Sequence, residues 1–191
     1  RPNVLFIISD DLTATALSCY ENKACKTPNI DRLAAEGTRY TRTFCQFPVC
    51  GPSRASFMSG YYPHATGVLG YTSPRPQIGD RETWSQHFMN NGYYSARVSK
   101  IYHMGVPGGV EEGKEGFDYN GSDDALSWTE RFNCPGPEWK APGDAELLQN
   151  NPDGTKPPRG GNMFTVVEAD GDDMVHCDGK TSAKAIELIE A

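Results

Sequence analysis

Residues 3–11 read Asn-Val-Leu-Phe-Ile-Ile-Ser-Asp-Asp, an apolar run that ends in a pair of carboxylates. A run of this length without polar alternation is typical of a parallel strand covered on both faces. In open α/β sheets, binding sites lie at the carboxyl ends of strands, which is where Asp10 and Asp11 stand. Adjacent carboxylates repel each other, and a bound calcium or magnesium ion relieves that repulsion. A solvated turn or a helix-capping pair is the alternative interpretation.

The segments that follow alternate between helical and strand patterns. Ile30, Leu33 and Ala34 form an i, i+3, i+4 stripe, and Gly37 is placed to end that helix. Similar patterns predict helices over 27–37, 52–59, 83–91 and 181–190, and strands over 39–44 and 93–99. This alternation predicts an α/β fold with a mostly parallel sheet. From 105 to 162 glycine, proline and acidic residues dominate, which predicts long loops and insertions over the scaffold.

Composition limits the classes of protein to which this chain can belong. Of 191 residues, 37% are hydrophobic, enough for a core, while 20 glycines and 14 prolines argue against a helix bundle. The net charge of −7 arises after residue 110, and the small basic excess before it suits an anion site better than a nucleic-acid track. No apolar run approaches the roughly 20 residues of a membrane span. No charged-then-apolar leader precedes residue 3, so we expect that any signal peptide is not in this numbering.

The six cysteines argue against two common motifs and leave disulfide bonds open. No two of them form a Cys-x-x-Cys pair, so a zinc ribbon or a thioredoxin site is not expected. An even number is compatible with disulfides and an oxidising compartment. The sequence leaves two pairings as candidates, Cys134 with Cys177 and Cys19 with Cys25.

The segment Cys50-Gly51-Pro52-Ser53-Arg54 places a cysteine just ahead of a predicted helix start. Free N–H groups and the positive end of the helix dipole converge there, which favours an anion or a thiolate. Arg54, one turn into the helix, can reach back towards the same place. The alternative is that Cys50 pairs with Cys45 or another cysteine in a structural disulfide.

Four ordered segments resemble the type I, formylglycine-dependent sulfatases of the alkaline phosphatase superfamily. They are the Cys50-x-Pro52-Ser53-Arg54 signature with residues 55–60 behind it, the opening 2–11, the stretch 27–34, and the segment 99–105 with Lys100 and His103. The Lys100-to-His103 spacing and residues 178–190 resemble the iduronate-2-sulfatase-like branch. Ser99 stands where many members of the family have glycine.

The resemblance implies an alkaline-phosphatase-like α/β sandwich, with a mostly parallel central sheet flanked by helices. It implies that residues 1–191 are the N-terminal portion of the catalytic domain, with loop-rich insertions over 105–180 and the C-terminal part absent. Further metal and sulfate ligands are expected beyond residue 191. Family members are usually exported, so a periplasmic, secreted or lysosomal location is expected.

The resemblance also implies a mechanism of sulfate ester hydrolysis. Cys50 would be oxidised to 3-oxoalanine (formylglycine) by a formylglycine-generating enzyme, and its hydrated aldehyde would attack sulfur and later expel sulfate. A calcium ion, rather than magnesium, would be held by Asp10, Asp11 and the residue at position 50. Arg54 would hold the diol and metal ligands in place. Lys100 would bind sulfate oxygens, and His103 would bind sulfate or orient the diol.

Other polar and aromatic residues have weaker assignments. His64 and Arg75 follow the signature helix and are candidates for the substrate pocket. His87 lies on the apolar face of a predicted helix and is expected in the core. Packing is the favoured role of the remaining aromatic candidates, with stacking on sugar rings as the alternative: Trp128, Trp139, Tyr61, Tyr62 and Tyr71.

The preferred hypothesis is a sulfatase acting on a sulfated carbohydrate or a small sulfate ester. A phosphodiesterase or phosphonate monoester hydrolase of the same superfamily is the nearest alternative. A non-catalytic carbohydrate-binding relative would keep an unmodified Cys50 and have no need for calcium. A disulfide-stapled secreted module would have neither a free nor an oxidised Cys50.

Overall fold

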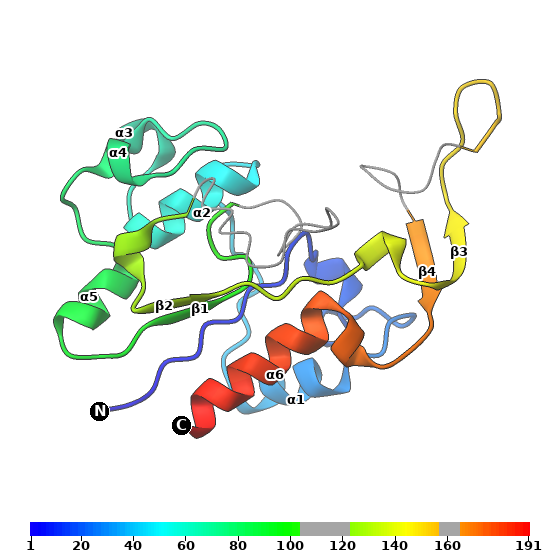
Figure 1. The fold of residues 1–191 in the computed structure, drawn as a ribbon, viewed down its shortest axis with the longest axis horizontal. Coiled ribbons are helices and arrows are strands. Elements are labelled where there is room, and N and C mark those ends of the chain that lie inside the picture. The colour runs from blue at the N-terminus through cyan, green and yellow to red at the C-terminus, as the bar shows by residue number, and fades with distance from the viewer. Residues whose placement is uncertain (104–122, 157–164) are drawn as a thin grey trace. The chain divides into compact units, whose positions relative to one another are not determined.

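A computed structural model describes residues 1–103, 123–156 and 165–191, and the chain divides into two units, Arg1–Cys45 and Gln46–Ala191. The first unit contains two short 3-10 turns, Ala14–Ala16 and Ser18–Tyr20, and helix α1, Pro28–Glu36. The described elements of the second unit are α2 Cys50–Ser59, α3 Pro63–Thr66, α4 Arg75–Ile78, α5 Trp84–Asn90, β1 Ala96–Val98, β2 Glu130–Phe132, β3 Gly143–Leu147, β4 Thr165–Ala169, α6 Cys177–Glu190 and the 3-10 turns Ala125–Ser127, Glu138–Lys140 and Asp173–Val175 (Figure 1).

Helix α1 confirms the helix predicted over 27–37. Pro28 stands at its first turn, where a missing N–H costs nothing, and Gly37 follows its end. The hydroxyl of Ser18 donates to the Asp31 carboxylate at 2.6 Å and lies 2.6 Å from the Thr27 hydroxyl. The bond from Ser18 lowers the pKa of Asp31, as does a bond from the Thr27 hydroxyl at 3.1 Å, and the Ser18 bonds join the turn Ser18–Tyr20 to the helix.

The strands predicted over 3–8 and 39–44 are wrong for this structure. Neither segment is paired with a strand in the described part of the chain. The apolar side chains of the first segment are exposed to solvent, and the relative accessible surface of Ile7 is 75%. A strand needs a neighbour for its N–H and C=O groups and a cover for its side chains, and the sequence of one strand specifies neither.

Helices α2 and α5 confirm the helices predicted over 52–59 and 83–91, and α2 begins two residues earlier than expected. Gly60 ends α2 in the left-handed conformation, with φ of 74°. Thr83 caps α5 by accepting a hydrogen bond from the Gln86 N–H. The main apolar cluster packs between these helices and the segment after β1, and its buried members are Met58, Tyr102 and Trp128.

Strand β1 confirms part of the strand predicted over 93–99, and it pairs in parallel with β2, which the sequence did not predict (Figure 1). The register places Arg97 opposite Arg131. Asp123 offsets this juxtaposition of like charges, because its carboxylate lies 2.8 Å from Arg97 and 3.7 Å from Arg131. Arg97 and Asp123 are both buried, so the pair holds the short strands to the core.

Strands β3 and β4 form a separate antiparallel pair within the region expected to be loop-rich. Residues 104–122 and 157–164 of that region lie outside the described residues. Helix α6 confirms the helix predicted over 181–190 and begins four residues earlier. The Lys184 ammonium lies 4.3 Å from the Phe132 ring, which joins α6 to β2.

The candidate disulfides are not formed, since all six cysteines are free in the structure. The Cys177 sulfur contacts hydroxyl groups instead, at 3.8 Å from Ser99 Oγ and 3.9 Å from Thr181 Oγ1. Burial raises the pKa of this thiol. Cys134 and Cys177 do not form a disulfide bond in the described chain, and neither do Cys19 and Cys25.

His87 is not a core residue, which corrects the prediction from the helical pattern. Its side chain is 66% exposed, and Nδ1 lies 3.0 Å from the Glu82 carboxylate. The apolar stripe of α5 is too short to cover the imidazole. Trp128, by contrast, is buried and its indole N–H donates to Asp123, as expected for a packed tryptophan.

Candidate functional site

The amino end of α2 presents Cys50 as the first residue of a ten-residue helix. Val49 precedes it in an extended conformation and supplies no side-chain cap. The first N–H groups of a helix have no partner within the helix, and the dipole makes this end positive. Position 50 is therefore suited to a negatively charged reacting group, as its place in the sequence predicts.

His103 and Tyr71 both contact the Cys50 side chain. The distance from Cys50 Sγ to His103 Nδ1 is 3.3 Å. The Tyr71 ring stacks on the His103 imidazole with centroids 4.0 Å apart. A hydrogen bond and the charge interaction with Cys50 raise the pKa of the Tyr71 hydroxyl. Sequence reasoning considered Tyr71 only as a packing or sugar-stacking ring, because no spacing signal joins residue 71 to residue 50.

Gly51 lets the helix approach the loop that carries Tyr71. A β-carbon at position 51 would lie 2.5 Å from the Gly70 carbonyl oxygen and 3.1 Å from Tyr71 Cδ1. The first contact is with backbone, which cannot turn aside as a long side chain can. The small residue after Cys50 is therefore a packing requirement of the site.

Arg54 fixes the segment that contains Lys100 and His103. The residue is 5% exposed, and its guanidinium donates to the carbonyls of Ile101 at 2.7 Å and Lys100 at 3.2 Å. Lys100 itself is half-buried at the end of β1. The structure thus joins α2 to residues 100–103. All four predicted catalytic residues take part in contacts across this junction, Lys100 through its backbone carbonyl.

Ser99, immediately before Lys100, has a strained backbone with φ of 57°. This region favours glycine, which agrees with the glycine that many family members have at this place. A hydrogen bond between the Ser99 and Thr181 hydroxyls, 2.7 Å apart, holds the side chain against α6. The turn at Ser99 directs the chain from β1 towards the end of α2.

Asp10 and Asp11 lie in the other unit, so their separation from Cys50 is not defined. Both residues are exposed at a turn that follows the apolar segment 3–8. Asp11 has φ of 56°, a conformation that aspartate tolerates better than most residues. Two exposed, adjacent carboxylates fit the oxygen chemistry of a calcium site. No group of three or more His, Cys, Asp or Glu side chains within 1–103, 123–156 and 165–191 is arranged to hold a metal.

His64 and Arg75 differ in the number of contacts that their side chains make within the protein. His64 is exposed on α3 and stacks on Tyr62, with ring centroids 5.4 Å apart. The Arg75 guanidinium uses all five N–H groups within the protein, on the Asp124 carboxylate, two backbone carbonyls and the Gln86 amide oxygen. This arrangement favours a structural role for Arg75, because no donor is left for a sulfate.

A family model described as "Sulfatase" matches residues 2–168, which is most of the chain. The chain belongs to the sulfatase family. This sulfatase-family chain therefore has the α/β fold class predicted from residues 2–105, and the resemblance on which that prediction rested is confirmed. Helices α1, α2 and α5 and the parallel pair β1–β2 belong to the matched range.

Curated relatives match the sulfatase-family chain at about 40% identity. A protein described as a sulfatase from Formosa agariphila is 39% identical over 118 residues, 58% of this chain and 23% of the relative. Human iduronate 2-sulfatase is 41% identical over 105 residues, 54% of this chain and 19% of the relative. A solved complex with the substrate D-glucosamine-2-N,6-O-disulfate has 31% identity and a TM-score of 0.48, and covers 62% of this chain and 22% of that one. The matched part spans about a fifth of each relative.

Proposed function

We propose that the whole protein hydrolyses a sulfate ester and that residue 50 supplies the nucleophile. The observation that carries this proposal is the meeting of three features at one side chain. Cys50 begins α2, its sulfur lies 3.3 Å from His103 Nδ1, and Tyr71 also contacts it. Membership of the sulfatase family supports the same reaction class.

The surroundings of Cys50 fit a residue that carries hydroxyl groups. His103 and Tyr71 can each donate or accept a hydrogen bond, as a diol at position 50 requires. Oxidation of Cys50 to 3-oxoalanine would supply a hydrated aldehyde, with one hydroxyl as nucleophile and a second to assist the release of sulfate.

Three residues of the chain have roles in binding and orienting the reacting groups. His103 holds a proton on, or accepts one from, the group at position 50. Lys100 provides a positive charge for sulfate oxygens, and the open helix end adds N–H donors. Arg54 acts through the backbone of residues 100 and 101, so that Lys100 and His103 stay in place.

Asp10 and Asp11 are the residues that we propose as calcium ligands, with residue 50 completing the part of the site supplied by this chain. Their exposed carboxylates match the hard oxygen ligands that calcium prefers, and a calcium ion needs six or more such ligands. The remaining ligands would come from the part of the protein beyond residue 191. When bound, calcium would supply positive charge against the nucleophile and a sulfate oxygen.

We also propose that residues 1–191 form the N-terminal portion of a sulfatase catalytic domain, with insertions over 105–180. Sulfated carbohydrates are the proposed substrate class, supported by the similarity to iduronate 2-sulfatase. A formylglycine-generating enzyme would be the partner that modifies Cys50. We also propose an exported location for the protein. His64 stays a prediction for the substrate pocket, and Arg75 stays one only as a lining residue, since its N–H groups are used within the protein. No helix in the described ranges is long and apolar enough to cross a membrane.

The first test is mass spectrometry of the tryptic peptide 43–54, from full-length protein made in its natural host. An aldehyde at position 50, with sulfur lost and oxygen gained, is the expected result. An intact thiol or a disulfide at Cys50 would contradict the proposed nucleophile.

The second test compares hydrolysis of an aryl sulfate and an aryl phosphodiester by the same preparation. Faster sulfate hydrolysis that is lost in Cys50→Ala and on calcium chelation supports the proposal. Preferential phosphodiester hydrolysis would replace it with the phosphodiesterase alternative. No hydrolysis of either ester by calcium-loaded, aldehyde-bearing protein would contradict the proposed reaction, whereas an inactive protein with an unmodified Cys50 would favour the non-catalytic relative.

A further inference from the structure

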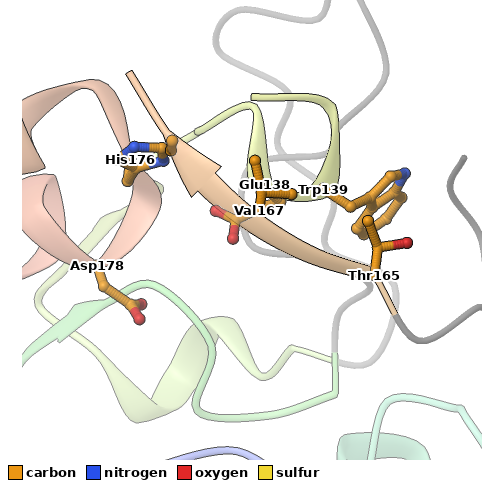
Figure 2. A pocket seen from close by; sticks show the side chains of 7 residues that line it. Glu138, Trp139, Thr165, Val167, His176 and Asp178 are labelled. Atoms are coloured by element: carbon orange, nitrogen blue, oxygen red, sulfur yellow. The ribbon is translucent and has the colours of Figure 1, made fainter. Parts of the chain in front are cut away.

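A cavity of about 440 Å³ lies beside β4 and the start of α6, outside the site around Cys50. Figure 2 shows that its polar side chains do not converge on one point, since the Trp139 nitrogen and the Thr165 hydroxyl point away from the Glu138 carboxylate. Each of these three residues also has a polar atom that is buried from solvent, so a molecule in the cavity could not contact those atoms together. Convergent side chains are found instead at the start of α2.

The Tyr71 ring lies between the first turn of α2 and the His103 imidazole. Its Cδ1 edge is against the helix backbone, because a β-carbon at Gly51 would lie 3.1 Å from it. The ring stacks on the imidazole with centroids 4.0 Å apart and an angle of 24° between the ring planes. Tyr71 is 59% exposed, and an exposed side chain loses rotamer freedom when its position is fixed. These two contacts hold the ring in one place although most of its surface is open.

The His103 imidazole needs such a neighbour, because its place in the chain does not orient its ring. Arg54 fixes the backbone just before it through two carbonyls. The torsion about the Cβ–Cγ bond of histidine is broad, so a fixed backbone still allows either edge of the ring to face residue 50. Turning between these orientations swings the imidazole out of its plane and into the space of the Tyr71 ring. The stack therefore hinders the turn and keeps Nδ1 at 3.3 Å from the Cys50 sulfur.

The hydroxyl of Tyr71 makes a separate contact, with the side chain of Cys50. The ring and the hydroxyl of this residue thus act on different partners. Loss of the hydroxyl removes one hydrogen bond at residue 50, whereas loss of the ring also releases the His103 imidazole. Substitution can separate the two effects, because phenylalanine keeps the ring alone and leucine keeps neither group.

We propose that Tyr71 is a positioning residue for the reaction at residue 50, and that its ring acts through the His103 imidazole. This inference rests on the proposed function, because it concerns the group that exchanges a proton with residue 50. Arg54 and Tyr71 have complementary effects on His103. The first fixes the backbone before it, and the second fixes the orientation of its ring.

The first test is NMR of full-length protein that carries isotope-labelled histidine rings. A stacked aromatic ring shifts the imidazole proton signals upfield, and His103→Ala identifies the signal of His103. We expect the shift to remain in Tyr71→Phe and to be lost in Tyr71→Leu. The His64 signal should not move in either variant, because His64 stacks on Tyr62. A His103 signal that is unchanged in Tyr71→Leu would overturn the proposal, whether or not the protein hydrolyses an ester.

The second test is steady-state hydrolysis of an aryl sulfate by full-length variants of equal aldehyde content. Tyr71→Phe is expected to lower kcat about fivefold, the effect of one lost hydrogen bond. Tyr71→Leu is expected to lower kcat about 50-fold, because a misplaced reacting group can cost about 100-fold. KM should stay nearly unchanged in both, since the residue affects the chemical step. Equal losses of kcat in the two variants would overturn the proposal. A raised KM with unchanged kcat would also overturn it and would assign Tyr71 to substrate binding.

A double substitution shows whether the ring acts through His103. In a His103→Ala background the imidazole is absent, so Tyr71→Leu should lower kcat only about fivefold further, the share of the hydroxyl. A general structural role of the ring would give the same loss in both backgrounds. An undiminished effect of Tyr71→Leu in the His103→Ala background would therefore contradict the proposal.

Tyr94→Leu is the matched control, since Tyr94 is 54% exposed and its hydroxyl donates to Glu130. Its kcat and its His103 signal should equal those of the unaltered protein. Chemical denaturation checks that each variant is folded, and Tyr71→Gln replaces Tyr71→Leu if the leucine variant does not fold. Absence of hydrolysis by the unaltered, aldehyde-bearing protein would contradict the proposed function. Normal hydrolysis with an unmoved His103 signal in Tyr71→Leu would contradict the role of Tyr71 alone.

Discussion

The imidazole of His103 lies 3.3 Å from the sulfur of Cys50, although 53 residues separate them in the chain. Two sets of contacts hold the segment of His103 beside Cys50. Arg54 donates to the carbonyls of Lys100 and Ile101, just before His103, and the Tyr71 ring stacks on the imidazole. The reacting group that we propose at position 50 therefore has a fixed neighbour that can exchange protons.

Replacing His103 with alanine is expected to lower kcat for an aryl sulfate by about 100-fold or more, the usual effect of losing a positioned proton-transfer group. The measurement is steady-state kinetics on full-length protein whose aldehyde content has been determined. His87→Ala serves as the control, because His87 is exposed on α5 and its imidazole pairs with Glu82 rather than with Cys50. Equal losses in the two variants, or none in either, would contradict the role of His103.

Gly51→Ala is expected to destabilise the protein by about 1–3 kcal/mol, the range for forced overpacking. The new methyl group would lie 2.5 Å from the Gly70 carbonyl oxygen and would displace the loop that carries Tyr71. Chemical denaturation gives the change in the free energy of unfolding. Gly70→Ala is the matched control, since a β-carbon there meets nothing within 4 Å in the described chain. A Gly51→Ala protein as stable as Gly70→Ala would show that the close approach is not required.

Substitutions at Ser99 separate backbone strain from hydrogen bonding. Ser99→Ala loses the bond to Thr181 and keeps the left-handed backbone, so it is expected to cost about 1 kcal/mol. Ser99→Gly loses the same bond but relieves strain worth about 1 kcal/mol, so it should be close to the unaltered protein in stability. Urea unfolding of both variants and of Thr181→Val tests this order. A glycine variant less stable than the alanine variant would refute the account.

Asp124 is expected to stabilise the fold at neutral pH and to lose that effect in acid. Burial raises the pKa of its carboxyl, but hydrogen bonds from Arg75 and Ser127 outweigh burial and hold it below its ordinary value. A lowered folded-state pKa gives stability that is present above the unfolded pKa of about 3.9 and is lost as pH falls through the folded value.

Asp124→Asn should therefore cost about 2 kcal/mol at pH 7, less than a fully buried pair because Arg75 is partly exposed. Thermal unfolding from pH 7 to pH 3 should show this difference shrinking as pH falls. Asp144→Asn, at an exposed position, should show no such dependence. A cost that stays constant with pH would exclude ionisation of Asp124 as its source.

Local signals predicted the helices and missed the strand pairing. The predictions over 27–37 and 83–91 succeeded because caps and apolar stripes are encoded within one segment. The prediction over 3–8 failed because a strand is defined by its neighbour. His87 shows the same limit, since its place on an apolar stripe did not decide its burial.

The sequence by itself determined the family and the group of candidate residues around Cys50, because those signals are runs of adjacent residues. Only the tertiary structure decided that Tyr71 contacts Cys50, that Arg75 is engaged with Asp124, and that the cavity beside Glu138 exists. Each of these depends on the meeting of segments far apart in the chain. Such contacts depend on packing and hydrogen-bond geometry in three dimensions, which no single segment of the sequence contains.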